Sequence, residues 1–326
     1  QRPQTQPTTL PRRAAHARAQ SRHLATHALP SASAALAATL AAPAFAQDWK
    51  AKYPELVFAI IPAENASGVV ERYTPFVNYL SKELGTKVTL RIASDYAALI
   101  EGQRAGNIHI GMYGPSSFAR ALMTGAKIEA FAIETNLDGT KGYYSVFYVK
   151  KDSPYQKIED LKGKNLGLVD PNSTSGNNVP RYALDGMKID PESYFGKVVY
   201  TGSHENAIIA LGQGTVDVAA NWWNDEQESN LQRMARKNMV KAEDFRIIYK
   251  SEQIVNSPMA YLSELPTELK AKIKDAVLNL NTKDKAAFDK IYEGKQGPLQ
   301  AVDNKAYDPI IELNKFVDAL RRKKAS

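Results

Sequence analysis

The sequence predicts an α/β protein of two lobes followed by a helical tail. Three observations support this fold class. Short apolar segments alternate with segments of helical periodicity from residue 56 onward. The alternation restarts near residue 165, and the stretch after residue 265 has only helical spacing. Strands separated by helices imply mainly parallel sheets covered by helices, and the restart implies a second sheet.

The first alternating series begins at residues 56–61, which are wholly apolar and are ended by Pro62, as is typical of a strand buried on both faces. Residues 73–84 then place apolar side chains four positions apart on one helical face, and Gly85 ends that helix. The series continues as strand, helix and strand at 88–92, 96–105 and 108–112.

The second series begins with a strand at 165–169 and a helix at 179–184. Strands follow at 197–200 and 216–219, and the tail contains helices at 270–280 and 309–320. Extended segments at 148–150 and 247–250 could cross between the lobes. We therefore expect lobe 1 to consist of residues 56–149 plus 250–326, and lobe 2 of residues 150–249.

A similar turn occurs once in each series. Residues 100–111 and 211–219 both contain a helix end, a Gly-containing turn and a short strand. Each leads into a polar and aromatic loop, which contains Tyr113 in the first copy and Asn224 in the second. Loops at the carboxyl ends of parallel strands are where α/β sheets bind ligands, although a common turn used twice is the alternative explanation.

The first 46 residues are typical of a secretory signal. They hold five Arg and no acidic residue, then an Ala/Leu-rich run, and end in an A-x-A cleavage pattern at Ala44–Ala46. The apolar run, counted from Ala28, is about 15 residues, too short for a spanning helix. We expect cleavage before Gln47, export to the periplasm, and no anchoring in the membrane.

Composition excludes several classes of function. Removal of the signal's five Arg lowers the formal charge from +7 to +2, so nothing favours a nucleic-acid partner. The chain has no Cys, which excludes disulfides, thiol catalysis and thiolate metal sites. We expect neither a cofactor nor a metal.

The most informative segment is residues 165–176, a strand followed by Ser173, Thr174, Ser175 and Gly176 before a helix. The N–H groups at a helix start favour an anion, and three hydroxyl donors suit a tetrahedral oxyanion. Ser or Thr before a helix is also a common N-cap, so the segment alone leaves both readings open.

Six ordered motifs give the chain a family resemblance. They are residues 94–97, 112–114, 142–146, 170–176, 204–206 and 216–219. Over residues 56–262 the chain resembles the phosphonate-binding proteins of ABC importers, close relatives of phosphite binders. This resemblance implies a type II periplasmic binding protein fold, in which two hinge strands join the lobes and the lobes close over the ligand. The partners it implies are a phosphonate or phosphite ligand and the importer's membrane permease.

The resemblance also assigns the residues that hold the phosphonate oxygens. On the matching positions they are Tyr96, Tyr143, Ser173, Thr174, Ser175 and His204. His109 lies inside a predicted strand and is more simply structural, whereas His204 precedes a predicted helix, where an imidazole can face an oxyanion.

The chain departs from the family at the group beyond phosphorus. Family members that take aminoethylphosphonate use two carboxylates for the ammonium, and Asn224 and Ser257 occupy those positions here. We therefore expect small uncharged substituents, with Trp222 or Trp223 as an apolar wall. A shift of one residue in the alignment would bring Asp225 or Glu205 to the amine instead.

Two other classes of function remain as alternatives. One is a binding protein for phosphate or another oxyanion, because a fold does not determine its ligand. The other is a two-lobed enzyme acting on a phosphorylated small molecule, but no nucleophile-elbow, phosphate-loop or H-E-x-x-H motif occurs. We therefore expect binding without catalysis.

Overall fold

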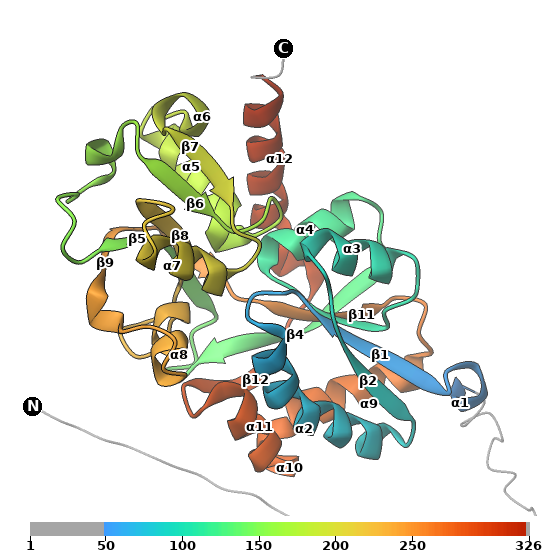
Figure 1. The fold of residues 1–326 in the computed structure, drawn as a ribbon. Helices are drawn as coiled ribbons and strands as arrows, with labels where there is room; N and C mark the ends of the chain where they lie inside the picture. The colour runs from blue at the N-terminus through green and yellow to red at the C-terminus, as the bar shows by residue number, and fades with distance from the viewer. Residues whose placement is uncertain (1–48, 324–326) are drawn as a thin grey trace, which may run out of the picture. The chain divides into compact units, whose positions relative to one another are not determined.

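The computed structural model describes residues 49–323 (Figure 1). The predicted signal at residues 1–46 lies outside this range. Within residues 49–323, no helix is both long and apolar enough to cross a membrane. The elements of the described part form two sheets, each covered by helices, and we call each sheet with its helices a lobe.

The first sheet has the strand order β12-β4-β11-β3-β1-β2. Its strands are β1 (Glu55–Ile60), β2 (Lys87–Ile92), β3 (Ile110–Met112), β4 (Ile128–Asn136), β11 (Pro258–Leu262) and β12 (Gln296–Ala301). β1 lies between β2 and β3 and is parallel to both, whereas β11, β4 and β12 join antiparallel. Five of the six residues of β1 are buried, as the apolar run predicts.

Helices cover both faces of this sheet. The helices of this lobe are α1 (Trp49–Lys52), α2 (Ala66–Leu84), α3 (Tyr96–Arg104), α4 (Pro115–Met123), α9 (Thr267–Leu278), α10 (Leu280–Lys283) and α11 (Lys285–Tyr292). In Figure 1, α2 and α9 to α11 lie on one side of the strands, and α3 and α4 lie on the other. Phe76 and Leu80 of α2 are completely buried, and Phe76 packs edge-on against Phe58 of β1.

The second sheet has the order β10-β5-β8-β6-β7, and β9 also pairs with β5. Its strands are β5 (Gly142–Lys150), β6 (Asn165–Leu168), β7 (Lys197–Tyr200), β8 (Val218–Trp223), β9 (Phe245–Lys250) and β10 (Ile254–Val255). β6 is parallel to both β7 and β8. The helices are α5 (Val179–Gly186), α6 (Pro191–Tyr194), α7 (His204–Gly212) and α8 (Asn230–Arg236).

The chain crosses between the sheets twice. One crossing joins β4 to β5 and the other joins β10 to β11. The two run side by side, since Asn256 N–H donates to Lys141 O and Glu134 N–H donates to Ser257 O. Strand pairing places residues 142–150 in the second sheet, next to β8. The lobe boundaries at 149/150 and 249/250 stay a prediction.

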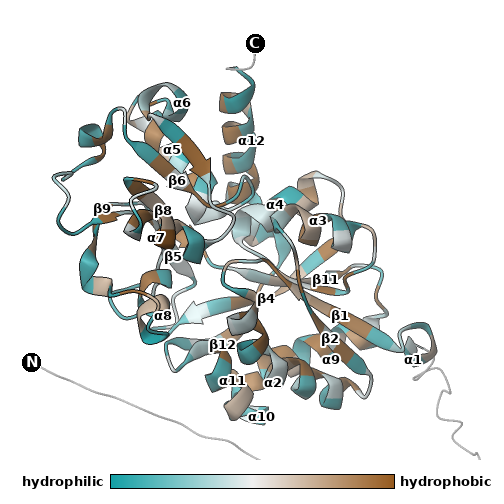
Figure 2. Cartoon of the chain, viewed as in Figure 1, coloured by the Kyte–Doolittle hydropathy of each residue, from teal (hydrophilic) through white to brown (hydrophobic). Residues whose placement is uncertain are grey.

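The C-terminal helix α12 (Asp308–Arg322) contacts both lobes. The amide of Asn314 is fully buried; it donates to Ser116 O at 2.9 Å and accepts from Asn178 Nδ2 at 2.8 Å. Figure 2 shows α12 as alternating hydrophobic and hydrophilic bands, as expected of a helix with one buried face. The predicted helical tail is therefore present, and it spans the two lobes.

Candidate functional site

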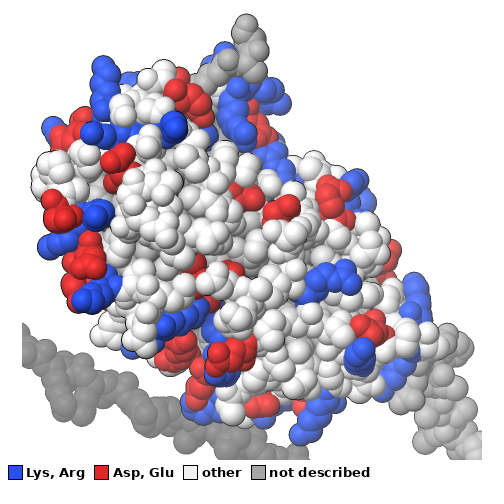
Figure 3. All heavy atoms as spheres, viewed as in Figure 1, with Lys and Arg blue, Asp and Glu red and all other residues white. Residues whose placement is uncertain are grey.

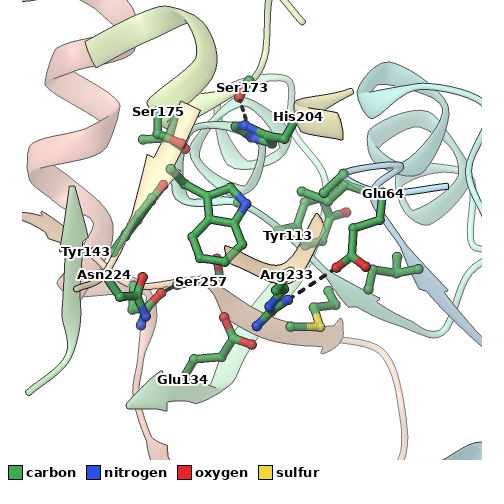
Figure 4. A pocket seen from close by; sticks show the side chains of 18 of the residues that line it. Glu64, Tyr113, Glu134, Tyr143, Ser173, Ser175, His204, Asn224, Arg233 and Ser257 are labelled. Carbon is green, nitrogen blue, oxygen red and sulfur yellow. Dashed lines mark hydrogen bonds and ion pairs between the residues drawn. The ribbon is translucent and has the colours of Figure 1, made fainter. Parts of the chain in front are cut away.

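A cavity of about 110 Å³ lies where the two lobes meet. Residues from both sheets and from α2, α3, α7 and α8 line it. All eight predicted site residues are among them: Tyr96, Tyr113, Tyr143, Ser173, Thr174, Ser175, His204 and Asn224. Figure 4 shows Ser173, Ser175 and His204 at one end, and Glu134, Arg233, Asn224 and Ser257 toward the other.

Ser173, Thr174 and Ser175 form the hydroxyl end, where the chain turns from β6 into a helical segment that continues as α5. Ser173 caps this segment by accepting from Gly176 N–H at 3.1 Å. Gly176 is required because a β-carbon there would lie 2.4 Å from Val169 Cγ2. Thr174 Oγ1 accepts from Ser116 N–H at 2.8 Å, a contact between the lobes. Ser173 therefore caps the helical segment, and the three residues of the segment also line the cavity, where a ligand could contact them.

Two tyrosines face the hydroxyl end. Tyr96 begins α3 and is 1% exposed, and its hydroxyl has no hydrogen-bond partner among the described residues. Burial raises the pKa of Tyr96, although the nearby Ser173 hydroxyl opposes this shift. Burial also raises the pKa of Tyr143 to about 12, against the effect of the neighbouring Thr174 and Ser175 hydroxyls. Both phenols stay protonated and can donate to an oxyanion.

His204 is the first residue of α7, and its ring is held by Asn221. Asn221 Nδ2 donates to His204 O, and Asn221 Oδ1 accepts from Trp222 N–H, so the amide orientation is fixed. His204 Nδ1, 3.1 Å from this oxygen, must then carry the proton. Burial lowers the pKa of His204 to about 4, so Nε2 is unprotonated at neutral pH and lies 3.5 Å from Ser173 Oγ.

The two other predicted residues contribute differently. The Tyr113 hydroxyl donates to Gln103 Oε1 at 2.6 Å, so it is already satisfied within its own lobe. Tyr113 therefore presents its ring rather than its hydroxyl to the cavity. Asn224 donates from Nδ2 to Asn136 Oδ1 at 2.9 Å, and its Oδ1 accepts no hydrogen bond from a described residue.

Charged side chains that the sequence analysis missed line the other end. Glu64 Oε1 accepts from Arg72 and Arg233, and Glu64 Oε2 accepts from Lys237 at 2.8 Å. Arg233 also donates from Nε to Glu228 at 2.6 Å and lies over the Trp222 ring. Arg72, Arg233 and Lys237 lower the pKa of Glu64 to about 2 despite its burial, so it stays ionised.

Glu134 is the fourth charged residue of the cavity wall. It lies on β4, and burial raises its pKa to about 7 against the effect of Arg233 and Arg72. The Tyr292 hydroxyl lies near it but forms no hydrogen bond of normal geometry. The signal in the sequence was a lone acidic residue between Ile133 and Thr135, shortly before the crossing to β5.

Charged side chains of both signs are mixed on the face drawn in Figure 3. On the face in Figure 3, basic and acidic side chains of the described residues are interspersed and form no continuous basic stripe. Within residues 49–323 no group of His, Asp or Glu side chains has the arrangement of a metal site.

Two mixed α/β lobes, two adjacent crossings and a small polar cavity between the lobes define a solute-binding protein that encloses its ligand. Comparison with known proteins agrees. A family model described as the periplasmic phosphonate substrate-binding protein of an ABC transporter matches residues 58–307. The chain belongs to this family, whose members bind a substrate for transport and are not enzymes.

Three relatives show how far the similarity extends. The phosphonates-binding periplasmic protein of Escherichia coli is 33% identical over 84% of this chain and 79% of its own. The phosphate-import protein PhnD of Mycolicibacterium smegmatis is 31% identical over 68% of this chain and 71% of its own. A solved binding protein of an ABC phosphonate transporter from Pseudomonas aeruginosa is 30% identical, with a TM-score of 0.73 over 82% of this chain and 88% of its own.

Proposed function

We propose that the mature chain, residues 47–326, is a periplasmic protein that binds a phosphonate in this cavity and delivers it to the membrane permease of an ABC importer. Export rests on the signal-like pattern of residues 1–46, and the permease partner rests on the family. One relative is named for phosphonates and another for phosphate import. The choice between these two ligands therefore rests on the residues that line the cavity.

The main support for an oxyanion ligand comes from the Tyr96 hydroxyl. It is buried, faces the cavity and has no hydrogen-bond partner among the described residues. An unsatisfied buried donor costs free energy, so such a group points to a ligand acceptor. Further donors line the same cavity, namely the hydroxyls of Tyr143, Ser173 and Ser175. Neutral donors around one point suit a phosphonate or phosphate group.

The apolar surface beside these donors favours a phosphonate over inorganic phosphate. Met112, Ile60 and the Trp222 ring line the same cavity. A carbon substituent on phosphorus can pack against them, whereas all four oxygens of phosphate would need polar partners. Phosphate stays the second candidate because of the mycobacterial relative's name.

We further propose that the lobes close on the ligand. Tyr96 belongs to the first lobe, whereas Ser173, Ser175 and His204 belong to the second. The crossings that would act as hinges lie between β4 and β5 and between β10 and β11. An anion held by donors from both lobes stabilises the closed arrangement relative to the open one.

Titration calorimetry with residues 47–326 tests this function. The panel is methylphosphonate, ethylphosphonate, 2-aminoethylphosphonate, phosphite, phosphate and sulfate. We expect one site per chain and tighter binding of at least one phosphonate than of phosphate. Tighter binding of phosphate than of every phosphonate would support the second candidate, and no binding of any compound would contradict the proposal.

A further inference from the structure

We propose that Glu134 selects the charge of the ligand's substituent, so that the cavity prefers a phosphonate whose carbon chain ends in an ammonium group. This inference rests on the proposed function and concerns the end of the cavity opposite the hydroxyl cluster. In Figure 4 Glu134 lies near Arg233 and Ser257, at the end of the cavity opposite Ser173 and His204. The position is therefore one that a substituent on phosphorus would approach.

The ion pairs around the cavity leave Glu134 without an ion-pair partner of its own, although Arg233 and Arg72 lie near enough to oppose the rise in its pKa. Four residues of the wall carry a formal charge: Glu64, Arg72, Glu134 and Arg233. Arg72 is paired with Glu64. Arg233 is paired with both Glu64 and Glu228. Within residues 49–323, Glu134 has no ion pair.

Polar side chains with an unused hydrogen-bonding atom line the same cavity as Glu134. Gln296 lines the cavity and is 6% exposed, and its buried Oε1 accepts no hydrogen bond from any described residue. Asn224 uses Nδ2 to bind Asn136, which leaves its Oδ1 available. Asn256 Nδ2 is an unpartnered donor on the neighbouring crossing. The carboxylate and two amide oxygens provide acceptors for three donors, the number an ammonium group has.

The geometry revises the expectation from the sequence. Asn224 and Ser257 both line the cavity and are uncharged, as their identities require. The carboxylate of Glu134 nevertheless lines the cavity from β4. This position is different from the two at which family members carry the carboxylates for the ammonium. A cationic substituent would find a counter-charge there, whereas an anionic substituent would be repelled by Glu134.

The test compares three ligands of equal phosphonate chemistry and different substituent charge: ethylphosphonate, 2-aminoethylphosphonate and phosphonoacetate. For the wild-type chain we expect the aminoethyl compound to bind at least about tenfold more tightly than ethylphosphonate, and phosphonoacetate to bind most weakly. Glu134→Gln keeps the shape and removes the charge. It should weaken binding of the aminoethyl compound at least about tenfold, leave ethylphosphonate nearly unchanged and improve phosphonoacetate.

Glu129→Gln is the matched control, because Glu129 lies on the same strand, pairs with Lys270 and does not line the cavity. It should change none of the three affinities. Glu134→Asp, which keeps the charge, should retain part of the preference, and thermal melting checks the fold of each variant. Equal loss or no loss of the aminoethyl and ethyl compounds in Glu134→Gln would overturn the inference. Failure of the wild-type chain to bind any of the three would instead overturn the proposed function.

Discussion

Lys237, which follows α8 in the second lobe, donates a hydrogen bond of 2.8 Å to Oε2 of Glu64, which follows β1 in the first lobe. The same ammonium group lies 3.0 Å from Glu205 Oε1, and Glu205 Oε2 accepts from the backbone of Asn65 at 2.7 Å. His204 N–H also donates to Ala63 O at 3.2 Å. The loop after β1 is therefore joined to α7 and α8 by several polar contacts that require the lobes to be close together.

Replacement of Lys237 by Met should favour the open form. The variant removes the bridge between the lobes and leaves Glu205 buried without its cation, so we expect phosphonate affinity to fall about three- to tenfold, mainly through faster release. Stopped-flow fluorescence gives the release rate, and small-angle scattering gives the compactness. Lys290→Met is the control, because the exposed pair of Lys290 with Glu71 lies within one lobe. Equal effects of the two variants would contradict the role of Lys237.

Loss of a single hydrogen-bonding side chain at the hydroxyl end should weaken binding without unfolding the protein. A hydrogen bond to a charged group contributes about 1.5 to 3 kcal/mol, so Ser175→Ala, which removes a donor, should weaken phosphonate binding about ten- to a hundredfold. His204→Ala should have a similar effect, because His204 Nε2 bonds to a ligand oxygen when a proton lies between them. Calorimetry measures the affinity and thermal melting checks the fold. Ser193→Ala, on the exposed surface of the second lobe, should have no effect. Unchanged affinity in both site variants would remove these residues from the site.

The buried His204 should make the ligand-free protein less stable in mild acid. Its pKa of about 4 in the folded chain lies below the ordinary 6.5. The unfolded chain therefore binds the proton more readily between these values, and the free energy of unfolding falls as the pH is lowered through this window. Between pH 7 and pH 5 this contribution is about 2 kcal/mol. Urea unfolding of wild type and His204→Gln at both pH values measures it; parallel pH dependence of the two would show that His204 does not titrate this way.

Glu134 should have the opposite effect. Its pKa is raised from 4.5 to about 7 by burial, so the folded chain holds a proton that the unfolded chain has lost. The stability that this proton contributes is present below pH 4.5 and is lost as the pH rises through 7. The stability of Glu134→Gln relative to wild type should therefore increase with pH across this window, as measured by urea unfolding without ligand. A constant difference between the two proteins would indicate an ordinary carboxyl.

Much of the fold could be predicted from the sequence because the hydrophobic periodicity is strong where the elements are regular. The expected strands at 56–61, 88–92 and 197–200 overlap β1, β2 and β7, and the helix at 309–320 lies within α12. The helix expected at 73–84 begins earlier, at Ala66, and contains Pro75 in its interior. No strand was predicted for β4 or for β10 to β12, and residues 247–250 of β9 were predicted only as an extended segment. The pairing of these strands is set by partners distant in sequence rather than by local pattern.

The hydroxyl end of the site was predictable and the charged end was not. Ser173 to Ser175 and His204 lie in loops and helix starts at strand ends, where topology and family motifs both direct attention. Glu64, Arg72 and Arg233 lie in a loop and two helices, and nothing local distinguishes them from surface charges. Arg72 and Glu64 pair within the first lobe, and Arg233 reaches Glu64 from the second lobe. The partners come from separate parts of the chain, and the Glu64 side chain is only 5% exposed.

The central claim, that the chain binds a phosphonate between its lobes without changing it, is tested most directly by phosphorus NMR. Ethylphosphonate is titrated into residues 47–326, and the ligand is then recovered by denaturing the protein. The account predicts one shifted resonance for each chain in the wild type, a strongly reduced bound fraction in Ser175→Ala, and recovery of unaltered ethylphosphonate. A spectrum without a bound resonance at saturating ligand, or the appearance of a new phosphorus compound, would contradict it.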